Sequence, residues 1–141
     1  MALTMDAAAL NRFLASDFPQ LPEGLIIDSA TPGLLIARLR IGEQHLRPGG
    51  TVSGPTMFAL ADVAAYAAIL SQIGPVALAV TTNASIDFMR KPAAGRDLLA
   101  ECRLLKLGRV LAVADTLIHS DGMPDPVARC SLTYSIPPKR G

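Results

Sequence analysis

The sequence predicts an α+β fold, in which a mostly antiparallel sheet of five or six strands wraps around one long helix. The first observation is a segment at 55–74 that is apolar almost all round and has one charged residue, which is typical of a buried helix. The second is a set of alternating segments before and after it, typical of strands with one buried face. The third is the length of 141 residues, half of them hydrophobic, which suits one domain with a substantial core. We therefore expect a single domain over residues 1–141, with its core at 24–136.

Three elements are expected before the long helix. Apolar residues recur at helical spacing over 6–15, which predicts a short amphipathic helix. Two alternating segments, 24–29 and 34–41, are separated by the turn signal Thr31-Pro32-Gly33 and predict a pair of strands.

The long helix has recognisable ends. Pro55 suits the first helical position, because its fixed φ is helical and its missing N–H is not needed there. Ser53 or Gly54 is then the N-cap. Gly74-Pro75 supplies the stop.

Four strands are expected after the helix. The segment 76–89 alternates between an apolar and a largely polar face. The segments 97–107 and 109–119 flank Gly108, which predicts a tight hairpin. The segment 127–136 alternates again and closes the sheet.

Asp62 is the one charged residue of the long helix, and burying a carboxylate is costly unless it is paired or used. A membrane span is disfavoured, because an aspartate at its centre costs roughly 2.5–3.5 kcal/mol on insertion scales and the flanking segments are typical of strands. Two interpretations stay open from the helix pattern alone. Asp62 is either a structural carboxylate, bonded to a neighbouring strand or to Tyr66, or a functional one.

Composition argues against several classes of protein. The net charge is +1 and no basic stripe is present, so we expect no nucleic-acid partner. Cys102 and Cys130 are far apart in expected strands and are interpreted as reduced core residues. His45 is interpreted as a surface loop residue and His119 as structural, and without a cysteine pair a metal site is not expected. The N-terminus has no signal-peptide pattern, so the cytoplasm is the expected location.

The run from Gly50 to Pro55 (Gly-Thr-Val-Ser-Gly-Pro), followed by Leu60-Ala61-Asp62, resembles the hotdog-fold acyl-CoA thioesterases. The likeness is strongest to the branch typified by phenylacetyl-CoA-type thioesterases. The segment 86–92 and the hairpin 106–109 are also similar to that family, so the resemblance covers roughly residues 24–136.

The resemblance implies hydrolysis of an acyl-CoA without a metal or further cofactor. The N–H of Gly54, at the helix N-terminus, would polarise the thioester carbonyl. Asp62 would activate water or attack directly, and the Thr81 hydroxyl would orient the water. In this family the site lies between two subunits, which implies a homodimer joined through the strand at 76–89 and possible assembly into tetramers.

Three positions depart from the family pattern. The family's histidine is Ser53 here, its second glycine is Pro55, and a loop asparagine is Arg47. Pro55 leaves the Gly54 N–H as a lone donor. Ser53 could still donate to the carbonyl or act as the N-cap, while no histidine is placed to make it a triad nucleophile. Arg47 could contact an acyl carboxylate or a CoA phosphate, or be solvated.

Binding of the CoA portion is implied for residues at loops and strand ends. Lysine and arginine suit phosphates, and ordinary solubilising charge at loops is the alternative explanation for each of these residues taken singly. The residues expected to bind substrate or CoA are Arg47, Pro55, Arg90, Lys91, Lys106, Gly108 and Arg109.

Two other functions stay open on the same fold. A non-catalytic acyl-CoA-binding protein is favoured by the changes at Ser53 and Pro55. An acyl-CoA dehydratase is less favoured, because such enzymes use a histidine with an acid and no histidine adjoins the long helix. Fold resemblance alone does not establish the reaction.

Overall fold

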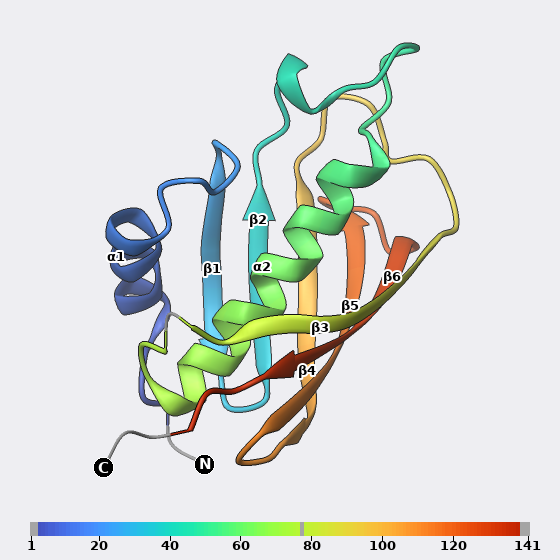
Figure 1. Cartoon of the computed structure of the whole chain (residues 1–141). Coiled ribbons are helices and arrows are strands. Elements are labelled where there is room, and N and C mark those ends of the chain that lie inside the picture. Colours follow the sequence, from blue (N-terminus) through green and yellow to red (C-terminus); the bar gives the residue numbers. More distant parts are fainter. Residues whose placement is uncertain (1–2, 77, 139–141) are drawn as a thin grey trace.

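The structure, a computed structural model, describes residues 3–76 and 78–138. A six-stranded antiparallel sheet curls around one long helix, and a shorter helix lies beside one edge of the sheet (Figure 1). The predicted α+β hotdog architecture, with the long central helix wrapped by the sheet, is confirmed. Its elements are α1 (Ala7–Asp17), β1 (Leu25–Thr31), β2 (Leu34–Leu39), the short 3-10 helix η1 (Glu43–His45), α2 (Gly54–Ile73), β3 (Val80–Phe88), β4 (Leu98–Leu107), β5 (Leu111–Ser120) and β6 (Pro126–Ser135).

The strands lie in the order β1-β2-β4-β5-β6-β3, and every neighbouring pair is antiparallel. Although β2 and β3 flank α2 in sequence, β3 pairs only at the far edge of the sheet, beside β6. The chain therefore crosses the sheet through α2, which runs diagonally over its concave face (Figure 1). This crossing carries the middle of α2 close to the ends of β3 and β6.

The ends of α2 follow from local chemistry. Ser53 is the N-cap with extended backbone angles, so of the two predicted caps the serine is the one used. Pro55 occupies the second helical position, one later than predicted, because the helix begins at Gly54. At the other end the Gly74 N–H donates to the Leu70 carbonyl at 2.9 Å, and its φ of 90° is one that glycine adopts without strain.

The sheet explains why α2 is apolar on every side. Twelve of its twenty residues are buried, including a run of alanines that lets the helix pack closely against the strands. By length and composition α2 could cross a membrane, but 67% of its apolar window is buried inside the protein. Such burial is typical of a core helix that is enclosed by a sheet.

The strand after α2 differs from its prediction. It was expected over 76–89 with one buried face. In the structure β3 begins at Val80, and the residues on both of its faces are nearly all exposed. Residue 77 lies outside the described part of the chain. A bulge between Thr81 and Asn83 also interrupts the expected alternation. Among the described strands β3 lies at the edge of the sheet and pairs with β6 alone, and little of the described chain packs over its faces.

Arg38 holds four segments together on the face of the sheet away from α2. Its guanidinium donates to Asp28 at 2.9 Å, Asp97 at 3.1 Å and Asp121 at 2.9 Å. These hydrogen bonds raise the pKa of Arg38 and, in return, the guanidinium lowers the pKa of Asp121. The cluster joins β1 and β2 to the start of β4 and to the turn after β5.

Both cysteines are free and buried, as predicted. Cys102 on β4 and Cys130 on β6 lie on either side of Thr116 on β5, in one row across the sheet. Burial raises the pKa of each thiol from 9.0 to about 11. They belong to the core beneath α2.

Candidate active site

Asp62 lies in the third turn of α2 and faces two hydroxyl groups. Its Oδ1 atom accepts a hydrogen bond from Thr81 Oγ1 on β3 at 2.6 Å. The same oxygen accepts from the hydroxyl of Tyr134 on β6 at 2.7 Å. The Tyr134 hydroxyl also lies 2.9 Å from the backbone carbonyl oxygen of Asp62. The aspartate is thus hydrogen-bonded to the neighbouring strands β3 and β6.

A pocket of about 420 Å³ opens beside Asp62. Three aromatic rings shape it: Phe18 packs edge-on against Tyr66 at 5.9 Å between centroids, and Tyr66 stacks with Tyr134 at 6.2 Å. Burial, followed by the negative charge of Asp62, raises the pKa of Tyr134 far above its usual 10.0. The tyrosine therefore keeps its proton as a donor. The lining residues are Phe18, Asp62, Val63, Tyr66, Ala79, Val80, Thr81 and Tyr134.

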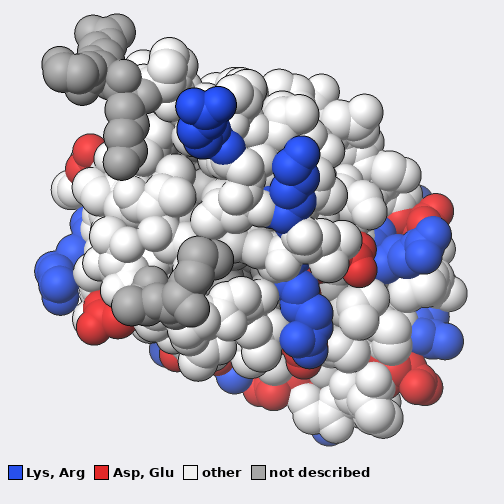
Figure 2. Space-filling view, turned by 90° about the horizontal axis from the view of Figure 1, so that it is seen from below, with Lys and Arg blue, Asp and Glu red and all other residues white. Residues whose placement is uncertain are grey.

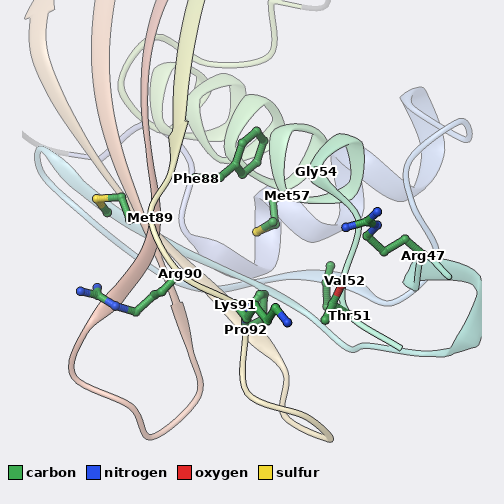
Figure 3. A pocket seen from close by; sticks show the side chains of 10 residues that line it. All are labelled: Arg47, Thr51, Val52, Gly54, Met57, Phe88, Met89, Arg90, Lys91 and Pro92. Atoms are coloured by element: carbon green, nitrogen blue, oxygen red, sulfur yellow. The ribbon is translucent and has the colours of Figure 1, made fainter. Parts of the chain in front are cut away.

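A second pocket, also of about 420 Å³, lies at the N-terminus of α2 (Figure 3). It is bordered by the loop before the helix and by the segment after β3. Its lining residues are Arg47, Thr51, Val52, Gly54, Met57, Phe88, Met89, Arg90, Lys91 and Pro92. Positive and apolar side chains therefore surround the helix N-terminus, where backbone N–H groups favour negative charge.

Gly54 carries the one available N–H of the first helical turn. The N–H of Thr56 donates to Ser53 Oγ at 3.3 Å, and that of Met57 donates to the Ser53 carbonyl at 3.2 Å. Pro55 has no N–H, and no described residue accepts from Gly54. The Ser53 hydroxyl lies 2.7 Å from that of Thr56, so the serine acts as a cap within the helix start.

The Phe88 ring lies close to Gly54. A Cβ atom placed on Gly54 would lie 3.1 Å from Cζ of the Phe88 ring, which is tighter than an ordinary contact. Phe88 is itself 52% exposed, although it is a large apolar side chain. The aromatic ring and the helix N-terminus form one wall of the second pocket.

The residues expected to bind CoA fall into two groups. Arg47 and Lys91 line the Gly54 pocket, together with Arg90, whose guanidinium also donates to the Pro126 carbonyl. Pro55, in the first turn of α2, is not among the residues that line either pocket. Lys106, Gly108 and Arg109 belong to the hairpin between β4 and β5, which Figure 1 places at the other end of the molecule. Viewed from the hairpin end, the Lys and Arg side chains stand apart on a mostly uncharged surface (Figure 2).

The two predicted catalytic groups do not meet within one chain. Gly54 and Asp62 are two turns apart on α2, roughly 12 Å along its axis at 1.5 Å per residue. They line different pockets. Thr81 and Asp62, by contrast, are brought together as hydrogen-bond partners.

Sequence reasoning missed Tyr134 and misplaced His45. Tyr134 was counted among alternating strand residues, although it bonds Asp62. His45 was expected on the surface, but it is 5% exposed and its Nδ1 accepts from the Gly42 N–H at 2.8 Å. Its carbonyl accepts from the Ser53 N–H at 3.0 Å, so η1 fixes the loop that leads into α2. A histidine three residues after a glycine is a weak signal for such a turn.

Comparison with known families identifies the architecture. Residues 49–127 match the family model described as the thioesterase superfamily. The chain belongs to this superfamily. The matched segment contains the Gly54 loop, α2, β3, β4 and β5.

Two curated relatives match part of the chain. A "putative esterase" of Pseudomonas aeruginosa is 37% identical over 87 residues, covering 61% of this chain and 64% of the relative. Acyl-coenzyme A thioesterase 13 of Mus musculus is 28% identical over 103 residues, covering 72% of each chain. The chain thus spans about two thirds of the length of the curated relatives it matches.

Solved structures match more of the chain. A "putative thioesterase" from Silicibacter sp. TM1040 is 59% identical with a TM-score of 0.91, covering 98% of this chain and 96% of that one. A mutant of the phenylacetic acid degradation protein PaaI from Thermus thermophilus is 26% identical with a TM-score of 0.71, covering 89% and 99%. These similarities agree with the resemblance to the phenylacetyl-CoA type of thioesterase.

Proposed function

We propose that the chain hydrolyses an acyl-CoA thioester to a free acid and coenzyme A. The observation that carries this proposal is a carboxylate in the middle of an otherwise apolar helix, held by two hydroxyl groups at the wall of a pocket. Membership of the thioesterase superfamily supports a thioester as the substrate. The similarity to an acyl-coenzyme A thioesterase supports CoA as the thiol portion.

The reaction needs an oxyanion site and an activated nucleophile. The Gly54 N–H and the dipole of α2 stabilise the negative charge that develops on the thioester oxygen. Asp62 takes a proton from water as the water oxygen attacks the carbonyl carbon, or attacks that carbon itself. Collapse of the intermediate breaks the carbon–sulfur bond, and the CoA thiolate leaves with the bonding electron pair and takes up a proton from Asp62 or from water. If Asp62 attacks directly, water then cleaves the resulting acyl–Asp62 anhydride, which releases the free acid and restores the carboxylate.

A second copy of the chain brings these two groups together in this proposal. The edge strand β3 is unpaired on its outer side among the described strands, and Val80 and Phe88 on it are 53% and 52% exposed. Two copies joined through β3 would set Asp62 of one copy against Gly54 of the other and would cover these apolar side chains. Assembly into tetramers and a cytoplasmic location stay predictions from the sequence.

The two groups of basic residues fit this arrangement. Arg47, Arg90 and Lys91 surround the Gly54 pocket, whereas Lys106 and Arg109 stand on the hairpin. In a composite site, cations from both copies would approach one CoA, whose phosphates suit lysine and arginine. Gly108 would allow the hairpin to turn, and Pro55, which has no N–H, would leave Gly54 as the lone donor beside it.

The first experiment measures release of free thiol from short, medium, long and aromatic acyl-CoAs. We expect turnover with at least one of them, and a loss of at least about 100-fold in kcat for Asp62→Asn, since the amide cannot act as a base. Asp125→Asn, which changes an exposed loop carboxylate, is the matched control and is expected to keep full turnover. Turnover that survives Asp62→Asn would overturn the mechanism.

A non-catalytic binding protein is the alternative that a specific observation favours. Pro55 removes one N–H from the helix N-terminus, so the oxyanion site has a single backbone donor there. Such a protein would show no thiol release while CoA esters raise its melting temperature. A dehydratase is less favoured, because none of the residues that line the Asp62 pocket is a histidine.

A further inference from the structure

Tyr134 is a hydrogen-bond partner of Asp62 that the proposed reaction has not used. Its hydroxyl and that of Thr81 both donate to Oδ1 of Asp62, at 2.7 and 2.6 Å. No described residue donates to Oδ2 of this carboxylate. The two carboxylate oxygens are therefore in different environments.

We propose that Tyr134 is a positioning residue, which with Thr81 occupies Oδ1 of Asp62 and leaves Oδ2 as the oxygen that acts on water or on the thioester. This inference rests on the proposed hydrolysis. It identifies Oδ2 as the reacting oxygen of Asp62. It also gives a role to Tyr134, which lies 72 positions further along the chain.

The strand pairing explains how the two hydroxyls converge. Thr81 and Tyr134 are directly opposite each other on β3 and β6, so their side chains leave the sheet on the same face. The bulge immediately after Thr81 interrupts the ladder at this point. Bulges often re-aim a side chain next to a functional site.

Packing holds Tyr134 in place. The residue is 3% exposed and its ring stacks with Tyr66 at 6.2 Å between centroids, with 29° between the planes. A buried ring with a stacked neighbour has little freedom to move its hydroxyl. Because burial and the nearby carboxylate raise the pKa of Tyr134, the hydroxyl keeps its proton and stays a donor.

A fixed Oδ1 restricts the rotation of the carboxylate. An ionised carboxylate accepts through two oxygens, and hydrogen bonds to a charged acceptor are about twice as strong as neutral ones. Two such bonds to one oxygen hold the plane of the group, so that the other oxygen keeps one direction. Since the Thr81 proton is directed at Asp62, this threonine also acts chiefly through the carboxylate, and towards water it could only accept.

The test is Tyr134→Phe, which removes the hydroxyl and keeps the stacked ring. We expect kcat to fall about 10- to 100-fold with KM changed less than about threefold, because misplacing a reacting group by a fraction of an ångström slows the chemical step. In the Asp62→Asn background the same substitution is expected to change kcat less than about twofold, since Tyr134 acts through the carboxylate.

Thr81→Val is the second variant and keeps the inference testable if Tyr134→Phe does not fold. We again expect kcat to fall while KM changes little. In the Asp62→Asn background, Thr81→Val is expected to leave kcat nearly unchanged. Thr82→Val is the matched control, because the Thr82 hydroxyl donates to the Thr133 carbonyl at 3.3 Å and does not contact Asp62. Its kcat is expected to equal that of the unchanged protein.

The outcomes separate this inference from the proposed function. Thiol release that is lost in Asp62→Asn but unchanged in folded Tyr134→Phe would overturn the positioning role and leave the hydrolase intact. A loss in Tyr134→Phe that persists in the Asp62→Asn background would overturn it too, because the tyrosine would then act independently of the carboxylate. Absence of thiol release from the unchanged protein would overturn both.

Discussion

Cys102 has no exposed surface, and burial raises the pKa of its thiol from 9.0 to about 11. In the unfolded chain this thiol ionises above pH 9, whereas in the folded chain it stays protonated until about pH 11. The unfolded state therefore binds fewer protons in this range, and stability that is complete below pH 9 is lost as the pH rises towards 11.

We expect Cys102→Ala to reduce this loss of stability at alkaline pH. Between pH 8.5 and 10.5 the free energy of unfolding is expected to fall by about 2 kcal/mol less in the variant, because one such thiol is absent. Urea unfolding at the two pH values, with a reductant present, measures it. The cavity left by the substitution lowers stability at both pH values and drops out of the comparison. An equal fall in both proteins would show that Cys102 does not contribute.

At the scale of single residues, the sequence reveals those functional candidates that differ from their neighbours in the chain. Asp62 stands out as a charge in an apolar helix, and the resemblance added Thr81 as a hydroxyl on the next strand. Tyr134 carries no such mark, because an aromatic residue in an alternating strand is ordinary. Its contact with Asp62 arises from the pairing of β6 with β3, a long-range arrangement that no local pattern encodes.

The N-terminus of α2 depends on its cap. Ser53 Oγ accepts the Thr56 N–H, and replacement of such a cap by alanine costs about 1 kcal/mol, whereas asparagine caps equally well. We therefore expect Ser53→Ala to lower the free energy of unfolding by about that amount, and Ser53→Asn to leave it nearly unchanged. Denaturant unfolding of the two variants provides the comparison.

The same pair of variants separates the two roles considered for Ser53. If the serine only caps the helix, Ser53→Asn keeps thiol release at the level of the unchanged protein. A loss of kcat in a stable Ser53→Asn protein would instead support donation from the hydroxyl to the thioester carbonyl. Equal stability of the alanine variant would show that the cap contributes little.

At the scale of elements, helices were predicted better than the strand at the edge. The predicted α2 begins and ends within one residue of the observed helix, because caps and stops are local signals. The predicted strand at 76–89 is shorter in the structure and exposed on both faces. Alternation of apolar and polar residues indicates that one face of a strand is to be buried. It does not indicate whether the same chain or a second copy buries that face.

At the scale of the whole molecule, the order of the strands determines where the exposed strand β3 lies. The order of strands could not be read from the sequence beyond the family resemblance, yet it decides which pockets form. It sets Asp62 beside β3 and β6, and it sets Gly54 beside Phe88 at the end of β3. One chain therefore presents two pockets, each next to the same exposed strand, as the proposed site between two copies requires.

Replacement of Gly54 by proline removes the N–H donor at the start of α2. Proline is well tolerated in the first helical turn, and it has no N–H. The residue before a proline prefers extended angles, and Ser53 already has φ of −72° and ψ of 151°. Position 54 is also helical and precedes Pro55, where a Cβ atom disfavours helical angles, and the half-exposed Phe88 ring must give way. The folding of Gly54→Pro is therefore checked first by circular dichroism and urea unfolding. Gly54→Pro is thus the counterpart of Asp62→Asn, with one half-site removed in each.

Mixing these two variants tests whether the site is shared between copies. Each variant alone is expected to release thiol at least about 100-fold more slowly than the unchanged protein. A dimer containing one copy of each, however, has one site in which both Gly54 and Asp62 are intact. If subunits combine at random, half of the dimers are mixed, and thiol release should return to about a quarter of that of the unchanged protein. The chains are refolded together from denaturant, with each variant refolded alone as the control. If Gly54 and Asp62 instead acted within one chain, no mixed dimer would contain a complete site, and the mixture would stay as inactive as its components.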